Sequence, residues 1–558
     1  MSIKVAVRVR PFNSREKDSK LIIDMQDTQT IIENPANGEK KVFNFDYSFW
    51  SHDGFIREED GYLKPEPGGR YADQKYVFEV LGQEILDNAW EGYNCCLFAY
   101  GQTGSGKSYS MVGYGANEGI VPISCQKIFE RIEQKQKEEP NIKYEVYVSM
   151  LEIYNEKIQD LLVSPNKRES QNLKIKEINK EYFVSGLTNL PVDNYESIAR
   201  IMEKGNDNRT VASTNMNATS SRAHTIISIQ LKVKRDGKPL RDSTINLVDL
   251  AGSERSKATG ATGDRLKEGC KINQSLSTLG NVINALADSE KAKSKGKAKL
   301  PPFRDSVLTK ILKGALSGNS KTVMICALSP SDMNYEETLS TLRYADRAKS
   351  IKTHAVINVN SNEAKIEQLE KENKALKAQL EEITKKMNLG TLNEADKANF
   401  LSLKEQFDDN EKEMTSMNKT FEERLRERQE QEREENYIKV DINKPHLVQL
   451  FEDIQLSYKK KYSLVELPVK VGKKSEIPTP AIILSGIGIK PNLAIFEKGK
   501  DNEIILKPRN PAGRSSIIIN NEEIPMEGHV LKTGDKIIFG ANEVMVYFET
   551  EEGQNIYK

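Results

Sequence analysis

A gapless glycine-rich motif of eight residues is the feature that most restricts how this chain can fold. It matches the Walker A pattern and directly follows the apolar run Cys95–Tyr100, which predicts a strand. In such a loop, consecutive backbone N–H groups converge on phosphate oxygens, and the helix that follows favours an anion at its N-terminus. We therefore predict a phosphate-binding strand–loop–helix unit rather than an incidental glycine-rich turn. The motif consists of Gly101, Gln102, Thr103, Gly104, Ser105, Gly106, Lys107 and Ser108.

Two side chains of the motif carry specific chemistry. Lys107 supplies a positive charge to the β- and γ-phosphates of a nucleotide, and Ser108 is expected to hold Mg²⁺. Asp249 follows the apolar run 245–248, and a carboxylate at the end of a strand can reach Mg²⁺ through water. Three residues later, the N–H of Gly252 can contact a γ-phosphate.

The composition excludes several classes of protein. The chain has 558 residues, with 82 lysines and arginines against 82 aspartates and glutamates, so it is not a wholly basic nucleic-acid coat and we expect no nucleic-acid partner. No apolar run is long enough for a transmembrane segment. The cysteines fit neither a disulfide framework nor a zinc site, which favours a reducing compartment. They are Cys95, Cys96, Cys125, Cys270 and Cys326.

The chain divides into three compositional regions. Up to residue 352, predicted strands alternate with helical patterns, as in an α/β domain. Residues 363–436 contain no proline and are dominated by charge, and short strand-like runs separated by turn residues follow from 446. The last region predicts a β-sandwich of about 110 residues. The strands predicted in the first region are 3–9, 95–100, 144–152, 226–233, 245–250 and 322–328, and those in the last are 481–484, 494–496, 503–506, 516–519, 536–539 and 544–548.

Taken together, the motifs of the first region resemble the kinesin motor domain, in the same order and across about 350 residues. The C-terminal region resembles the forkhead-associated domain that follows the motor in kinesin-3 proteins, and a lysine-rich insertion agrees with that family. The resemblance implies an α/β P-loop NTPase with a central mixed sheet between two layers of helices, followed by helical coiled-coil segments and an all-β sandwich. The matching motor segments are 8–11, 100–108, 151–156, 217–224, 249–254, 341–345 and 355–358.

The resemblance assigns a nucleotide site for ATP or ADP with Mg²⁺. Arg8, Arg10 and Pro11 would pack around the adenine, since a planar ring suits guanidinium and pyrrolidine faces. Without the family match, an exposed strand face would be an equally good interpretation of the two arginines. Tyr109, which follows the motif, is assigned to the same site.

The resemblance also implies two switch segments. Ser220 and Ser221 would contact the γ-phosphate and Mg²⁺, and Gly252 would sense the γ-phosphate. Arg222 and Glu254 would pair across the switches and position the attacking water, because phosphoryl transfer depends mainly on placement and charge neutralisation. The predicted metal ligands are Ser108, Ser221 and Asp249.

The track-binding surface is predicted from charge. Alone, the lysine run between 287 and 303 would indicate a solvated loop or a localisation signal. In kinesins, however, this place faces tubulin, whose acidic tails would attract it over long range. The lysines of the run are Lys291, Lys293, Lys295, Lys297 and Lys299, and the expected closer contacts are Arg255, Lys257, Arg265, Lys267 and Arg304.

Residues 353–363 resemble the neck linker that follows the motor domain 1–352, with Asn358 at the family's latch position. Residues 364–388 form a heptad seam that predicts a weak parallel homodimer, the alternative being one amphipathic helix packed on its own protein. The charged helical segment 389–436 either folds back on the motor to inhibit it, as in kinesin-3 proteins, or is a solvated linker helix. The first seam comprises Ile366, Leu369, Asn373, Leu376, Leu380, Ile383 and Met387, and the second segment has apolar positions Phe400, Leu403, Phe407, Met414, Met417 and Phe421, interrupted by Asn410.

The forkhead-associated region, 437–552, departs from the pattern that reads phosphothreonine. Lys473 stands in place of the arginine, Leu493 in place of the histidine, and Asn521 in place of a glycine. Lysine cannot form the bidentate fork that arginine makes with phosphate. We therefore expect a structural or docking module that binds a cargo or adaptor protein.

These features predict an ATP-driven, plus-end-directed microtubule motor for cargo transport in the cytoplasm, associated with the cytoskeleton. The alternatives are a nucleotide-gated microtubule binder or regulator without transport and, more distantly, a phosphopeptide-binding scaffold.

Overall fold

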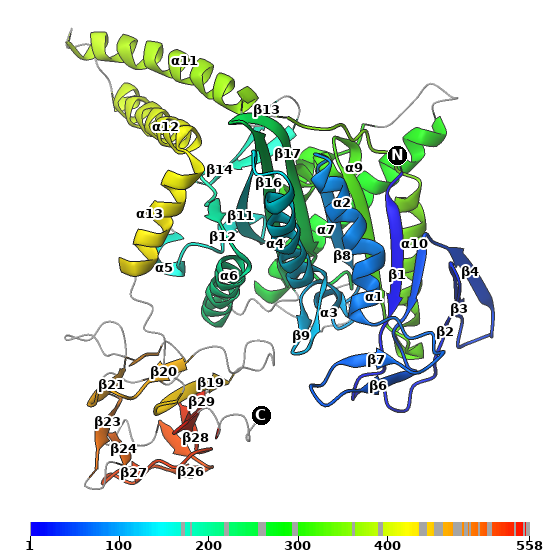
Figure 1. Cartoon of the computed structure of the whole chain (residues 1–558), viewed down its shortest axis with the longest axis vertical. Helices are drawn as coiled ribbons and strands as arrows, with labels where there is room; N and C mark the ends of the chain where they lie inside the picture. The colour runs from blue at the N-terminus through cyan, green and yellow to red at the C-terminus, as the bar shows by residue number, and fades with distance from the viewer. Residues whose placement is uncertain are drawn as a thin grey trace. The chain divides into compact units, whose positions relative to one another are not determined.

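The computed structural model divides the chain into two compact units (Figure 1). The first unit comprises residues 1–205 and 219–429, and the second comprises 206–218 and 430–558. The described residues are 2–168, 173–178, 181–216, 222–254, 264–292, 300–359, 363–388, 394–434, 443–450, 461–472, 482–484, 489, 493–499, 503–509, 516–540, 543–550 and 553.

A nine-stranded mixed sheet forms the centre of the first unit. Along the sheet the strand order is β12-β11-β16-β17-β8-β18-β1-β5, and β15 pairs with β11. The strands are β12 (Lys157–Asp160), β11 (Ile142–Tyr154), β16 (His224–Arg235), β17 (Lys238–Asp249), β8 (Cys95–Tyr100), β18 (Lys321–Leu328), β1 (Lys4–Val9), β5 (Tyr47–Trp50) and β15 (Leu190–Val192).

The neighbouring strands β17, β8, β18 and β1 are parallel to one another. Their carboxyl ends therefore meet at one edge of the sheet, which is where open α/β sheets bind ligands. The Walker A loop follows β8 at this edge, Asp249 is the last residue of β17, and Arg10 follows β1 directly. Sheet topology thus gathers segments that are far apart in the sequence.

Helices cover both faces of the sheet and bury a separate apolar core on each (Figure 1). The core of one face includes residues of α2 (Gln83–Trp90), α4 (Ile120–Glu138) and α6 (Tyr195–Met216), with α1 (Gln74–Val77) and the π-helical turn η1 (Phe78–Gly82) leading into α2. The opposite core includes residues of α7 (Asp264–Ala292), α8 (Val307–Ile311), α9 (Lys313–Ser317) and α10 (Tyr335–Lys349).

Short hairpins and turns surround the sheet. They are β2 (Ile23–Gln26), β3 (Gln29–Glu33), β4 (Lys40–Asn44), β6 (Phe55–Arg57), β7 (Leu63–Pro65), β9 (Gly113–Tyr114), β10 (Asn117–Glu118), β13 (Lys174–Ile178) and β14 (Glu181–Ser185), with the helical turns α3 (Lys107–Met111), α5 (Pro165–Arg168), η4 (Phe303–Asp305) and η5 (Asp332–Asn334).

Two long helices after α10 pack against each other, α11 (Glu363–Asn388) and α12 (Glu394–Asn418). Asn373 contacts Met414, so the pair is antiparallel around the short connection between the helices. Leu369 and Ile383 of the predicted dimer seam are buried in this arrangement. These two seam positions are therefore buried within the chain itself, and the predicted homodimer stays a prediction.

Residues 421–428 of helix α13 (Phe421–Glu434) contact the sheet edge of the first unit. The ring of Phe421 meets the ring of Tyr147 edge-on at 5.4 Å between centroids, and the guanidinium of Arg424 lies 4.7 Å from the same ring. Arg428 is buried, and its Nη1 donates to the carbonyl of Pro191 at 2.5 Å. The charged segment is thus held by aromatic and hydrogen-bonding contacts.

The second unit carries two sheets whose inner faces share one apolar core. One sheet has the order β20-β19-β29-β28-β25-β26 and the other β22-β21-β23-β24-β27. Their strands are β19 (His446–Leu450), β20 (Lys461–Ser463), β21 (Val469–Gly472), β22 (Ile482–Ile483), β23 (Ala494–Lys498), β24 (Ile504–Pro508), β25 (Ile517–Ile519), β26 (Glu522–Glu523), β27 (His529–Val530), β28 (Lys536–Phe539) and β29 (Glu543–Phe548).

The predicted strands of the first region are all present, but β5, β12 and β15 of the central sheet were not predicted. These three strands have four residues or fewer and lie at or beside the ends of the sheet, where a long apolar run is not needed. Over the part of the chain that the structure describes, no helix has the length and apolarity required to cross a membrane.

Candidate nucleotide-binding site

The loop between β8 and α3 approaches the neighbouring strand too closely for any side chain at its first position. Gly101 has φ = +147°, and a Cβ there would collide with the carbonyl of Ala327. Gly104 and Gly106 also have positive φ values, +74° and +104°. Glycine is required at such positions because other L-residues are strained there. The glycines of the motif are thus explained by the backbone path itself.

The Lys107 ammonium lies inside the loop. Its Nζ donates to the carbonyls of Gly101 and Gln102, at 2.9 Å in each case, and the residue is only 7% exposed. Burial lowers the pKa of Lys107, while the nearby carboxylates of Asp249 and Glu254 partly oppose that shift. A buried cation held among backbone carbonyls is suited to binding phosphate oxygens.

Ser108 and Asp249 are brought together as candidate Mg²⁺ ligands. The hydroxyl of Ser108 donates to Oδ2 of Asp249 at 2.6 Å, although 141 positions separate the residues. Within the described part of the chain, the buried Oδ1 of Asp249 has no hydrogen-bond partner. A hydroxyl beside a carboxylate with a spare oxygen is a donor set that Mg²⁺ accepts, so these residues fit the ion.

Glu254 contacts the nucleotide-binding loop directly. Its Oε2 accepts from the backbone N–H of Thr103 at 2.8 Å, and its Oε1 accepts from the Thr103 hydroxyl. A Cβ at Gly252 would lie 2.2 Å from the Thr103 hydroxyl and 2.3 Å from Oε2 of Glu254, so any side chain there would have to displace this contact. The predicted pairing of Glu254 with Arg222 stays a prediction.

His224 connects three elements behind the site. The backbone N–H of Ala251 donates to its Nδ1 at 3.0 Å, and its Nε2 lies 2.7 Å from the hydroxyl of Ser275 in α7. Burial lowers the pKa of His224 to about 3, with a smaller contribution from the charge of Lys107. The imidazole is therefore neutral at physiological pH and serves as a hydrogen-bonded link between β16, the end of β17 and α7.

The residues assigned to the adenine gather at one small pocket. Arg8, Arg10, Pro11 and Tyr109 line it together with Ser105 of the loop. The alternative of an exposed strand face is wrong for Arg8, which is 3% exposed. Its guanidinium donates to Ser51, Gln74, Ser110 and the carbonyl of Ala72, and it lies 5.2 Å from the Tyr109 ring.

The segment after α10 lies along the first unit and is hydrogen-bonded to it. Asn358 donates from its backbone and its side chain to the carbonyl of Gly92, at 2.9 and 3.1 Å. Its Oδ1 accepts from Asn319 at 2.7 Å, and its own carbonyl accepts from the backbone N–H of Asp242. Gly92 has φ = +97°, and a Cβ there would lie 3.0 Å from Ile357.

A family model described as "Kinesin motor domain" matches residues 8–351, more than half of the 558 residues. This chain is a member of the kinesin family. Kinesin motor domains hydrolyse ATP within an α/β P-loop fold, and the fold described above is of that type. The predicted family is thereby confirmed.

Several curated kinesins align with nearly the whole chain. "Kinesin-related protein 1" of Dictyostelium discoideum is 45% identical, over 91% of this chain and 24% of its own length. Mouse "Kinesin-like protein KIF28" is 42% identical, over 99% of this chain and 51% of its own length. Rat "Kinesin-like protein KIF1A", a kinesin-3 protein, is 38% identical over 99% of this chain and 36% of its own length. This kinesin thus spans about half or less of the relatives it matches.

Two solved kinesin structures each match about two thirds of this chain. A KIF14 dimer in a two-heads-bound state, with AMP-PNP and in complex with a microtubule, is 42% identical with a TM-score of 0.57, covering 66% of this chain and 98% of the solved one. The structure of a fast kinesin is 38% identical with a TM-score of 0.55, covering 65% and 95%.

Many predicted contact residues of this kinesin lie outside the described residues. These are Ser220, Ser221, Arg255, Lys257, Lys293, Lys295, Lys297 and Lys299. Arg265, Lys267 and Lys291 fall within α7, whose backbone is described at those positions. Arg304 is described: its side chain is 80% exposed and lies 3.4 Å from Glu177 of the β13–β14 hairpin.

Motif analysis missed the partners that hold the nucleotide site in place. Ser51 and Gln74 accept from Arg8, and Thr103 was predicted as a nucleotide contact but not as the partner of Glu254. Ser51 and Gln74 belong to no recognisable motif. The need for these acceptors follows from the burial of the Arg8 charge, which the sequence did not reveal.

Proposed function

We propose that this chain is an ATP-driven microtubule motor that moves toward plus ends and transports cargo. The observation that carries the proposal is the docked neck segment, in which Asn358 is hydrogen-bonded to Gly92 directly after α10. A segment that can be held along the motor or released is the element that a transporting motor needs and a passive binder does not. Kinesins with the motor before this segment move toward plus ends.

In the proposed hydrolysis step each described side chain has one task. Lys107 binds the β- and γ-phosphates, and Ser108 with Asp249 would hold Mg²⁺, which neutralises phosphate charge when bound. Glu254 and Gly252 sit against Thr103, so a change at the γ-phosphate would reach the second switch through this contact. We assign Ser220, Ser221 and Arg222 to the first switch on the family resemblance.

We assign microtubule binding to α7 and its flanking segments and to Arg304, with the lysine run supplying long-range attraction. The solved KIF14 motor is in complex with a microtubule, and the two motors are 42% identical. Arg304 is exposed and sits in a small charged group with Glu177 and Lys313, where it could exchange an internal acidic partner for one on tubulin.

We further propose that the segment 389–436 restrains the motor. Helix α12 covers the seam of α11, so the weak dimer proposed for 364–388 cannot form while the helices are paired. Nζ of Lys176, in the β13–β14 hairpin, donates to the buried Asn410 at 2.6 Å and lies 3.7 Å from Glu372. Opening these contacts would free both the seam and the hairpin.

The C-terminal sandwich is proposed to be a forkhead-associated domain that docks a cargo or adaptor protein. Leu493, at the place of the histidine reader, is fully buried in the apolar core. Nδ2 of Asn520 donates to Oδ1 of Asp535 at 2.8 Å, and Oδ1 of Asn520 accepts from the backbone N–H of Lys536 at 2.9 Å. With these positions used internally, strong phosphopeptide binding is not expected.

A gliding assay with polarity-marked microtubules tests the main proposal. The full chain should move microtubules with their minus ends leading, and Asn358→Ala should slow movement while ATP binding persists. Glu254→Ala serves as the hydrolysis-deficient control. ATP-dependent microtubule binding without movement would instead favour the nucleotide-gated regulator.

A further inference from the structure

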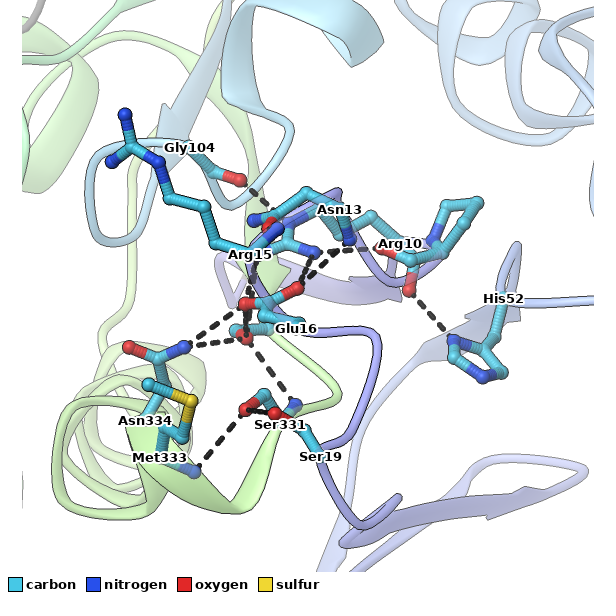
Figure 2. Close-up of polar contacts among 12 residues, drawn as sticks. Arg10, Asn13, Arg15, Glu16, Ser19, His52, Gly104, Ser331, Met333 and Asn334 are labelled. Carbon is cyan, nitrogen blue, oxygen red and sulfur yellow. Dashed lines mark hydrogen bonds and ion pairs between the residues drawn. The ribbon is translucent and has the colours of Figure 1, made fainter.

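A buried carboxylate beside the nucleotide-binding loop has no role in the site as described so far. Glu16 lies in the loop after β1 and is 4% exposed. Both its oxygens pair with the Arg10 guanidinium, with Nη1 2.5 Å from Oε2 and Nη2 2.7 Å from Oε1 (Figure 2). Such a two-point ion pair fixes the plane of the guanidinium as well as its position.

The plane so fixed directs Arg10 at the nucleotide-binding loop. The third nitrogen, Nε, donates to the carbonyl of Gly104 at 2.6 Å (Figure 2). The backbone carbonyl of Arg10 in turn lies 3.0 Å from Nδ1 of His52, on the opposite side from Glu16. Arg10 therefore connects the strand end of β1 to the middle of the Walker A loop in a single orientation.

The same carboxylate reaches the loop by a second route. Nδ2 of Asn334, at the start of α10, donates to Oε1 of Glu16 at 3.1 Å. Oδ1 of Asn334 accepts from Nε2 of Gln102 at 3.0 Å. Ser329 adds a hydrogen bond to Oε1 of Glu16 at 3.1 Å. Glu16 thus connects with the loop at Gly104 through Arg10 and at Gln102 through Asn334.

These partners keep Glu16 ionised. Burial by itself would raise the pKa of Glu16, but the hydrogen bonds from Arg10 and from the backbone of Asn13, together with the charge of Arg10, lower it below its ordinary value. A buried ion pair contributes through geometry, and removing one partner leaves the other charge without compensation.

We propose that Glu16 is a positioning residue for nucleotide binding, which acts through Arg10 and is braced by Asn334. Glu16 does not touch the nucleotide. It holds the Arg10 guanidinium and the Gly104 carbonyl at the separation that the bound nucleotide requires. The inference rests on the proposed nucleotide site, since it presumes that Arg10 and the loop bind ATP.

The test compares nucleotide affinity and turnover in the full chain. Glu16→Ala should weaken binding of N-methylanthraniloyl-ADP about tenfold or more and raise the KM for ATP by a similar factor. The kcat at saturating ATP should stay within about twofold, because Ser108, Asp249 and Glu254 are untouched. Glu16→Gln keeps the shape but loses the charge, and should show a smaller loss in the same direction.

A double-mutant cycle shows whether Glu16 acts through Arg10. In an Arg10→Ala background, Glu16→Ala should add less than about threefold to the loss of affinity. Fully additive losses would overturn the proposal, as would a fall in kcat with unchanged KM. Wild-type affinity in Glu16→Gln would equally overturn it, even if Glu16→Ala failed to fold.

Two controls distinguish a positioning role of Glu16 from a loss of stability and from an error in the nucleotide site. Glu84 forms a 2.6 Å ion pair with Lys4, which lies in the same strand β1. Glu84→Ala removes this ion pair and should leave nucleotide affinity unchanged. An equal loss in Glu84→Ala would mean general destabilisation and would overturn the proposal. Lys107→Ala tests the nucleotide site itself, and unchanged nucleotide affinity in this variant would refute the site. If Lys107→Ala lost nucleotide affinity while Glu16→Ala bound nucleotide normally, only the role of Glu16 would be refuted.

Discussion

The nucleotide site and the helical segment from α11 to residue 429 of α13 belong to the same unit but are held in different ways. The site is assembled from the ends of the adjacent parallel strands β8 and β17. Pairing of these strands therefore brings the Ser108 hydroxyl to 2.6 Å from Oδ2 of Asp249. The helical segment is attached through side chains, among them Arg428 and Phe421, and not through backbone hydrogen bonds of paired strands. A site built this way is permanent, whereas an attachment of the second kind can open.

The energetic scale of the two regions differs accordingly. Removing the buried Arg428 side chain would cost about 1.5–3 kcal/mol, the contribution of hydrogen bonds to a charged group. An attachment of that size can be exchanged for dimerisation or microtubule binding. In the nucleotide site, by contrast, loss of the Lys107 side chain would remove the buried cation that faces the phosphates.

The largest effect is expected at the nucleotide site, where Glu254→Ala should lower the ATPase rate by about a hundredfold or more. ATP should still bind, since Lys107 is intact, and the chain should remain tightly bound to microtubules. Steady-state ATPase measurements and co-sedimentation with microtubules check this, with the exposed Glu138→Ala as the matched carboxylate control. Equal ATPase rates in wild type and Glu254→Ala would contradict the assignment of Glu254.

An intermediate effect is expected where α13 meets the sheet edge. Arg428→Ala should release the segment, raise microtubule-stimulated ATPase several-fold and increase the dimer fraction, since a few kcal/mol separate the two states. Arg426→Ala also removes one arginine charge, but from an exposed position of α13. This variant should change neither the microtubule-stimulated ATPase rate nor the dimer fraction. Analytical ultracentrifugation at matched concentration provides the measurement. If Arg428→Ala kept the dimer fraction and the ATPase rate of the wild type, α13 would be no more than a linker.

A smaller, salt-dependent effect is expected from the lysine run. Replacing Lys291, Lys293, Lys295, Lys297 and Lys299 with alanine should raise the microtubule concentration for half-maximal ATPase about tenfold at low salt. The plateau rate should change little, because long-range attraction acts on encounter rather than on hydrolysis. Repeating the titration across ionic strength is the check. A defect that persisted undiminished at high salt would argue for a fixed contact instead.

The smallest effect is expected on the outer face of α11. Lys371 pairs with Glu367 at 2.6 Å, with both side chains about two-thirds exposed or more, so Lys371→Ala should change the free energy of unfolding by less than about 0.5 kcal/mol. Leu369→Ala, at a fully buried seam position of the same helix, should cost about 2–5 kcal/mol of local stability. Hydrogen exchange across α11 compares them. If the amides of α11 were protected from hydrogen exchange to the same extent in Lys371→Ala and Leu369→Ala, the seam would not be what holds α11 in place.

The helical segment also marks the limit of what periodicity predicts. The spacing of Phe400, Leu403 and Phe407 indicated an apolar face, with Asn410 as its interruption, yet those three side chains are only partly buried and Asn410 is 4% exposed. Asn410 can be buried because Lys176, which is 234 positions away, donates to it. No pattern within the helix encodes that partner.

Sequence alone determined the parts of this kinesin whose chemistry is local. The Walker A loop, its glycines and the strand before it follow from one contiguous motif, because positive φ values and phosphate binding restrict each position separately. The tertiary structure alone decided that Arg8 is buried, that Glu16 clamps Arg10, and that α12 covers the seam of α11. Those outcomes depend on which distant side chains satisfy a buried charge or cover an apolar face, and that is fixed only when strands and helices meet.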